Sequence, residues 1–256
     1  MINAQRRPML TGFAGLPLGE IKQCSRGDVG ILGVPGEVKT GSRFGTSLAP
    51  GALRKMAERL EVKLPGSGYD LGNMDMSGDW SGTLMHLVTQ MTDRQVVPVV
   101  LGGDTDVATA VLEALPELPV VATMPQVRRD VAARPANTIW VGLNGEQPVE
   151  TWDQISQREM IWRTARQLDE GATDIPLESD CAALWIDLSV VDLGHAAGVV
   201  GLNPGGMKPE TLVSVIGSMP CSWRVIVITG LAPALDTRGM SELIAIETLI
   251  AALRNG

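Results

Sequence analysis

Residues 182–188 read Ala-Ala-Leu-Trp-Ile-Asp-Leu, a run of consecutive apolar side chains interrupted only near its end by Asp187. A strand with apolar residues at successive positions is buried on both faces, as in a parallel sheet covered by helices. Comparable runs occur at 29–34, 96–101, 138–143 and 224–229, with a weaker one at 119–123. These runs predict the strands of a mainly parallel sheet.

The stretches between these runs have the period of helices. Leu84, Leu87, Val88 and Met91 follow the spacing of one helical face, and residues 105–115 and 246–253 do the same. Residues 148–168 predict one long helix or two short ones, and Ser241 before Glu242 predicts the cap of the last helix. Alternating strands and helices indicate a three-layer α/β/α fold. We expect one domain over residues 1–256.

Composition excludes several classes of protein. The chain has 256 residues, 45% hydrophobic residues and a net charge of -8, and no cluster of Lys and Arg offers a basic face to nucleic acid. Its three cysteines are far apart in sequence, which suits a reducing cytoplasm rather than a disulfide framework. The first residues lack an apolar leader and no run is long enough to cross a bilayer, so we expect a cytoplasmic protein without membrane contact.

Four segments carry short motifs in a fixed order along the chain. They are Gly33-Val34-Pro35 with Gly41-Ser42-Arg43-Phe44-Gly45, then Asp70-Leu71-Gly72-Asn73-Met74-Asp75, then Leu101-Gly102-Gly103-Asp104-Thr105-Asp106, and finally Ile186-Asp187-Leu188-Ser189-Val190-Val191-Asp192 leading to Asn203-Pro204-Gly205-Gly206. Together they resemble the motifs of the ureohydrolase (arginase/agmatinase) family, and the resemblance covers most of the chain. It implies an arginase-like fold.

The resemblance also implies that most of the metal ligands of the family are missing from this chain. The family binds two divalent ions, which generate hydroxide from water, through His and Asp ligands on three loops. The position of the His is Thr105, and the second loop, at 122–126, contains neither Asp nor His. In the last motif Asp187 matches the first ligand and Ser189 stands at the second. We therefore expect a degenerate member with no metal or other cofactor.

Groups that would bind the substrate also differ from the family pattern. Gly230 stands where the family has a Glu that pairs with the guanidinium, and Asn144 stands where it has an Arg. The resemblance therefore implies a substrate cleft lined by Thr105, Met124, Ser189, Asn144 and Gly230, which suggests a ligand more neutral than arginine or agmatine.

A few polar residues have both a structural and a chemical interpretation. Asp187 would cap a loop and Asp104 would cap a helix with help from Asp106, yet these carboxylates and His195 are also the candidates for catalysis if the chain is active. His195 lies in a long Gly-rich loop, whereas His86 would face solvent from a helix.

Three hypotheses follow for the function. The first is a non-catalytic or regulatory subunit of a homo-oligomer, or of a hetero-oligomer with an active ureohydrolase paralogue. The resemblance implies a trimer or a hexamer. The second is a metal-independent enzyme acting on a guanidino, ureido or amide metabolite. The third is a small-molecule binding module that uses the cleft.

Overall fold

The computed structural model describes residues 12–37, 43–132, 137–144 and 147–254. In these ranges eight strands form one sheet with the order β2-β1-β3-β8-β7-β4-β5-β6. The strands are β1 (Val29–Val34), β2 (Gly68–Asn73), β3 (Val97–Gly102), β4 (Val120–Thr123), β5 (Thr138–Leu143), β6 (Trp162–Thr164), β7 (Cys181–Asp187) and β8 (Ser222–Thr229).

Every pair of neighbouring strands is parallel. The carboxyl ends of the strands therefore lie together at one end of the sheet. We call this end the carboxyl rim, and it comprises the loops that begin at Pro35, Gly103, Met124, Asn144, Leu188 and Gly230. In such sheets ligands bind outside the carboxyl ends of the strands.

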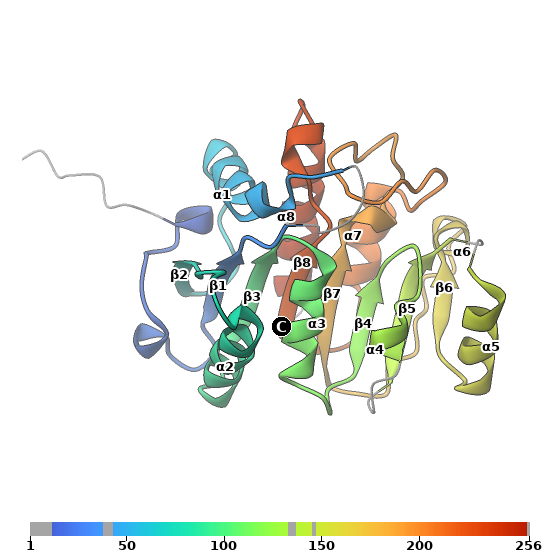
Figure 1. Cartoon of the computed structure of the whole chain (residues 1–256), viewed down its shortest axis with the longest axis horizontal. Helices are drawn as coiled ribbons and strands as arrows, with labels where there is room; N and C mark the ends of the chain where they lie inside the picture. Colours follow the sequence, from blue (N-terminus) through green and yellow to red (C-terminus); the bar gives the residue numbers. More distant parts are fainter. Residues whose placement is uncertain (1–11, 38–42, 133–136, 145–146, 255–256) are drawn as a thin grey trace, which may run out of the picture.

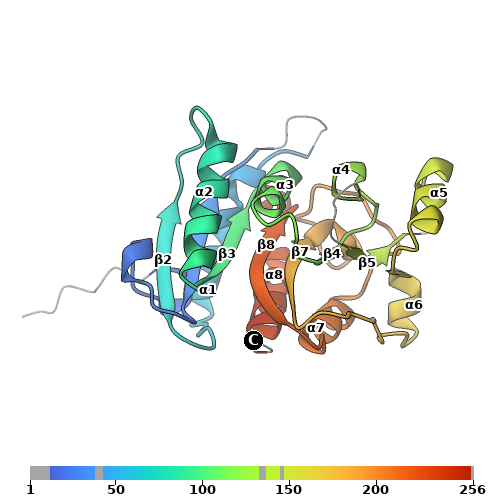
Figure 2. The ribbon, with the colours of Figure 1, turned by 90° about the horizontal axis from the view of Figure 1, so that it is seen from below.

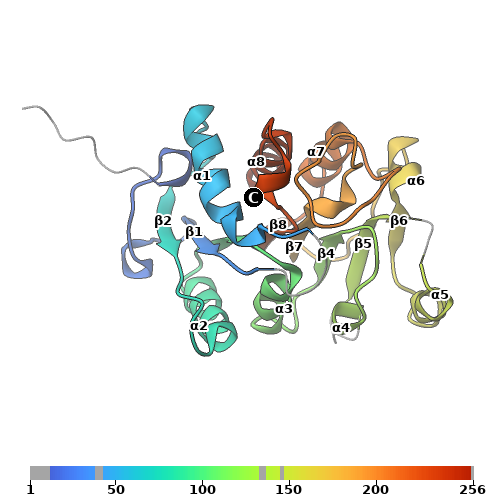
Figure 3. The same cartoon turned by 45° about the horizontal axis from the view of Figure 1, so that its top comes forward.

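Helices cover both faces of the sheet (Figures 1, 2 and 3). One face carries α1 (Ala49–Arg59), α6 (Ala165–Asp169), α7 (Pro209–Gly217) and α8 (Met240–Leu253). The other carries α2 (Trp80–Asp93), α3 (Thr105–Glu113), α4 (Arg129–Ala132) and α5 (Val149–Gln157). The predicted three-layer α/β/α fold is thus confirmed. None of the helices in the described part of the chain has both the length and the apolar character needed to cross a lipid bilayer.

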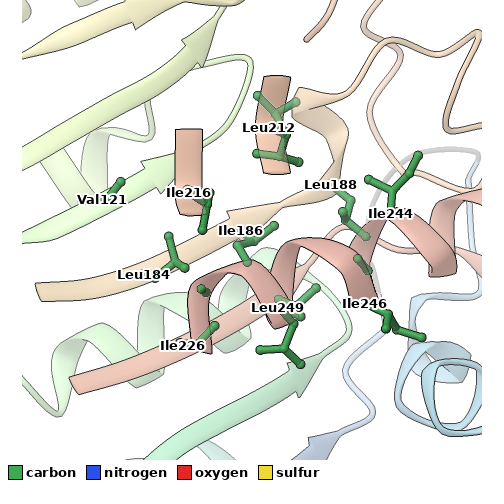
Figure 4. Packing of buried hydrophobic residues seen from close by; sticks show 14 of the residues in the cluster. Val121, Leu184, Ile186, Leu188, Leu212, Ile216, Ile226, Ile244, Ile246 and Leu249 are labelled. Atoms are coloured by element: carbon green, nitrogen blue, oxygen red, sulfur yellow. The ribbon is translucent and has the colours of Figure 1, made fainter. Parts of the chain in front are cut away.

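Buried apolar side chains fix the helices to the sheet. Figure 4 shows Leu184 and Ile186 of β7 packed with Ile226 of β8, Ile216 of α7 and Leu249 of α8. A second cluster on the opposite face contains Trp140 and Trp185. Each fully buried Leu or Ile side chain contributes about 1.5–3 kcal/mol relative to an exposed one. The central strands are therefore packed against helices on both faces, and the loops at their ends are attached to well-packed strands.

Two strands were not predicted. The Gly and Asp residues of β2 are poor strand formers, and this strand is stabilised mainly by pairing with β1. The stretch predicted as helix at 148–168 contains α5 and α6, but β6 separates them. Thr164 ends that strand and begins α6 through a capping box with Gln167.

The predicted cap of the last helix is wrong. The helix α8 begins at Met240, after Gly239 in the left-handed conformation, so Ser241 lies inside its first turn. The Ser241 hydroxyl donates to Asp236 Oδ2 (2.7 Å) and accepts from the Gly198 N–H (2.9 Å). Asp236 instead accepts the backbone N–H groups of Arg238, Gly239 and Ser241, because its carboxylate precedes the helix.

A buried ion pair joins α1 to β2. Asp70 is 1% exposed and accepts hydrogen bonds from Arg54 Nε (2.7 Å) and Nη2 (2.8 Å) and from the N–H groups of Phe13 (2.7 Å) and Gly72 (2.9 Å). Burial alone would raise the pKa of Asp70, but these hydrogen bonds outweigh it and lower the pKa below its ordinary value. The carboxylate is therefore held ionised at the point where three segments meet.

We expect Arg54→Ala to lower the free energy of unfolding by about 3–5 kcal/mol, because it leaves the buried charge of Asp70 uncompensated. Urea denaturation would measure the loss. Arg59→Ala, on the exposed end of the same helix, is the control and is expected to stay within about 0.5 kcal/mol of the parent. Equal losses for the two variants would contradict this role for the pair.

A second carboxylate holds the segment that leads into α1. Glu37 accepts the N–H groups of Gly45 (2.8 Å), Thr46 (3.2 Å) and Ser47 (3.2 Å) and the Ser47 hydroxyl (2.6 Å). Partial burial opposes ionisation, but these hydrogen bonds prevail and lower the pKa of Glu37 from 4.5 to about 2. Glu37 thereby connects the loop after β1 to the start of α1.

Because the folded pKa of Glu37 lies below its unfolded value, its ionised form contributes stability above pH 4.5, and this contribution is lost as the pH falls from 4.5 towards 2. The difference in unfolding free energy between the parent and Glu37→Gln should therefore be constant above about pH 5.5 and shrink in acid. Urea denaturation at a series of pH values would measure it. A difference independent of pH down to 3 would refute the assignment.

Candidate functional site at the carboxyl rim

Close backbone contacts fix the loops in the middle of the rim. A Cβ at Gly103 would lie 1.8 Å from the carbonyl oxygen of Gly36, so only glycine fits between the loops after β1 and β3. The Gly103 carbonyl also accepts the N–H of Gly230 (3.0 Å) at the end of β8. Three loops are thus held backbone to backbone, and the residues that follow them have defined positions.

The first of these residues begin α3. Asp104 is the N-cap and its Oδ1 accepts the N–H of Asp106 (2.9 Å), which confirms its predicted structural role. Asp106 lies in the first turn, where a negative charge stabilises the helix dipole. Thr105, between them, is half-buried at the rim.

Asp187 lies at the end of β7 and is 7% exposed. Its Oδ1 accepts the Ser189 N–H (2.9 Å) and so caps the short 3-10 helix at Leu188–Val190, as its structural interpretation predicted. Burial raises the pKa of Asp187, while the hydrogen bonds from Ser189 and the charge of Arg128 oppose that rise. Ser189 is itself buried, and its hydroxyl accepts the N–H of Gly201 (3.0 Å).

Gly230 leaves room for Asp187. Its φ is +79°, and a Cβ at this position would lie 2.4 Å from Asp187 Oδ1. Any side chain at residue 230 would therefore have to displace the carboxylate and adopt a strained backbone.

An arginine outside the sequence motifs lies among these residues. Nη1 of Arg128 donates to the hydroxyl of Thr105, and Nη2 is 3.9 Å from Asp106 Oδ1. The guanidinium carbon is 5.9 Å from the centre of the Trp185 ring, whose Nε1 donates to the Thr229 hydroxyl (2.7 Å). Its place in the sequence could have indicated this, because Arg128 comes two residues after the segment 122–126, which lacks Asp and His, and soon after the end of β4.

The loops after β4 and β5 place the other predicted lining residues. Met124 is buried in the apolar core, and Asn144 is half-buried. Gln147 joins the two loops, because its amide donates to Asn144 Oδ1 (2.9 Å) and the Pro125 carbonyl (2.8 Å) and accepts the Val127 N–H (3.0 Å). Met124 thus supports the rim from beneath rather than from its surface.

The long loop after β7 carries His195, which is exposed in a turn where its N–H donates to the Asp192 carbonyl (2.9 Å). Within the described ranges, its side chain makes no hydrogen bond with Asp187, which bonds to Ser189 instead. Arg43 holds the later part of this loop by donating to the Val199 carbonyl (2.6 Å). Part of the glycine-rich motif at 41–45 lies outside the described residues. His86 is exposed on α2, as expected.

Among the side chains that the structure describes, no group of three or more His, Cys, Asp or Glu residues is arranged to hold a metal ion. The cysteines Cys24, Cys181 and Cys221 are free thiols.

Comparisons with known proteins agree with this architecture. Residues 27–123 match the model of the arginase family. The formimidoylglutamase of Bacillus subtilis (strain 168) is 23% identical in an alignment of 277 residues, gaps included, that covers 88% of this chain and 86% of that protein.

Solved structures share the fold. The formimidoylglutamase of Bacillus subtilis superposes with a TM-score of 0.80 at 20% identity, covering 99% of this chain and 94% of that one. Proclavaminate amidino hydrolase from Streptomyces clavuligerus gives 0.79 at 18% identity over 96% of both chains. Agmatine ureohydrolase of Thermoplasma volcanium gives 0.78 at 16% identity over 89% of both. The chain is thus similar to the arginase family over residues 27–123 and has the fold of these solved structures.

Proposed function

We propose that this chain is a single-domain ureohydrolase-family protein that does not hold a dinuclear metal centre and acts as a non-catalytic or regulatory subunit of an oligomer. The observation that carries the proposal is the contact between the Arg128 guanidinium and Thr105, because it brings a fixed positive charge to the position of a family metal ligand. The carboxyl rim would then serve stability and assembly rather than hydrolysis.

The chemistry of the donor groups supports this proposal. Two divalent ions need several carboxylate and imidazole ligands to lower the pKa of a bridging water. At the matching positions Thr105 receives a hydrogen bond from Arg128, and the Ser189 hydroxyl receives one from Gly201. Asp187 is the remaining carboxylate and already caps a helix. These residues do not fit a dinuclear centre. They supply too few anionic ligands, and the guanidinium of Arg128 would compete with the metal ions.

The groups that would bind a guanidinium substrate argue in the same direction. A carboxylate side chain at residue 230 would overlap Asp187, and Asn144 is engaged by Gln147. The alternative of metal-free acid–base catalysis has less support, because His195 is exposed on the outer loop.

Exposed apolar side chains support the role in assembly. The 3-10 helix at Thr46–Leu48 contacts the one at Pro233–Leu235, and α8 begins soon after. Leu48, Leu235 and Met240 are exposed on these segments, and Phe44 is exposed two residues before Thr46. We call these four residues the apolar patch. Apolar side chains gathered at a surface are typical of protein–protein contacts.

We expect the purified chain, after loading with Mn²⁺ and dialysis, to retain far less than one ion per chain and to release no urea from arginine or agmatine. Elemental analysis and a urea assay would measure this, with an active ureohydrolase treated in parallel as the control. A retained pair of ions per chain, or urea release above the buffer rate, would overturn the proposal.

We expect Leu48→Glu to weaken an oligomer of this chain, or its complex with an active ureohydrolase from the same genome, because the charge would be buried in the contact. Native mass spectrometry would report the assembled species. Leu60→Glu, an exposed leucine after α1 and outside the apolar patch, is the matched control. A parent chain that is monomeric both alone and with the paralogue would exclude the role in assembly.

A further inference from the structure

We infer that Arg128 is the resident cation of the carboxyl rim, so that the site is occupied by a guanidinium from the chain itself. The inference rests on the proposed function and deepens it, because it names the group that excludes metal ions. It also names the class of ligand that the site would accept once Arg128 is removed, which is a small planar guanidinium cation.

Charge is the first argument. Asp106 lies in the first turn of α3 and Asp187 ends β7, and Nη2 of Arg128 is 3.9 Å from Asp106 Oδ1. Carboxylates gathered at the end of a sheet repel one another unless a cation compensates them. In this chain a side chain provides that cation, and a divalent ion approaching Thr105 would meet its charge.

Shape is the second argument. A guanidinium is planar, so one face can stack on an aromatic ring while the N–H groups at its margin donate hydrogen bonds. The guanidinium carbon of Arg128 is 5.9 Å from the centre of the Trp185 ring, within the range of a cation–π contact, and its Nη1 donates to Thr105. The Trp185 ring is fixed in turn by its hydrogen bond to Thr229. The surroundings therefore match a guanidinium in both charge and shape.

The next residue along the chain offers a contrast. Arg129 is 65% exposed and lies 3.7 Å from Glu150, itself 74% exposed, whereas the side chain of Arg128 is 32% exposed and contacts residues of the rim. Exposed ion pairs contribute little to stability. Arg129→Ala is thus a matched control that removes the same side chain from outside the site.

The experiment is chemical rescue of Arg128→Ala, followed by thermal unfolding. We expect the variant to melt about 3–6 °C below the parent, and millimolar methylguanidinium to restore most of this loss. Neither the parent nor Arg129→Ala should respond. Tetramethylammonium, which has charge without N–H donors, and urea, which has planar donors without charge, should rescue poorly. Adding Asp106→Asn to Arg128→Ala should weaken the rescue.

Absence of rescue, equal stabilisation of Arg129→Ala, or equal rescue by tetramethylammonium would overturn the inference. Should Arg128→Ala not fold, Arg128→Val keeps the first part of the apolar stem, leaves the space of the guanidinium open and takes its place in the same measurement. The proposed function is judged separately by the metal content of the parent chain. A metal-free parent whose Arg128 variant is not rescued would reject the resident cation alone.

Discussion

The contact of backbones at the carboxyl rim is the constraint on which the site depends. Gly103 lies between the carbonyl of Gly36 and the N–H of Gly230, so the loops after three strands approach more closely than side chains would allow. This contact fixes the chain directly before α3, which begins at Thr105. The positions of Thr105 and Asp106 therefore follow from it.

The sheet could be predicted from sequence wherever burial alone decides the structure. The runs at 29–34 and 138–143 coincide with β1 and β5, because strands covered on both faces leave a continuous apolar record. The strand β2 leaves no such record, since Asp70 is buried in it and balanced by Arg54 from α1. A buried charge of this kind is visible only when its partner from another element is known.

The part of the site that depends on local structure could be predicted from the sequence. Asp104 and Asp187 cap the elements that follow them, which is a local function of residues directly before a helix. Arg128 contacts Thr105 of α3 and Trp185 of β7, which are distant from it in sequence. Sequence spacing could therefore not assign its role. The predicted cap at Ser241 is wrong because the Ser241 hydroxyl bonds to Gly198 and Asp236 instead of capping its own helix.

The geometry at Gly230 also limits which substitutions this position tolerates. A Cβ here would occupy space held by the Asp187 carboxylate, on a backbone with positive φ. A side chain at residue 230 would therefore have to displace Asp187 and adopt a strained backbone. Residues 187 and 230 are thus mutationally coupled, and a side chain at residue 230 becomes sterically possible only together with a change at residue 187.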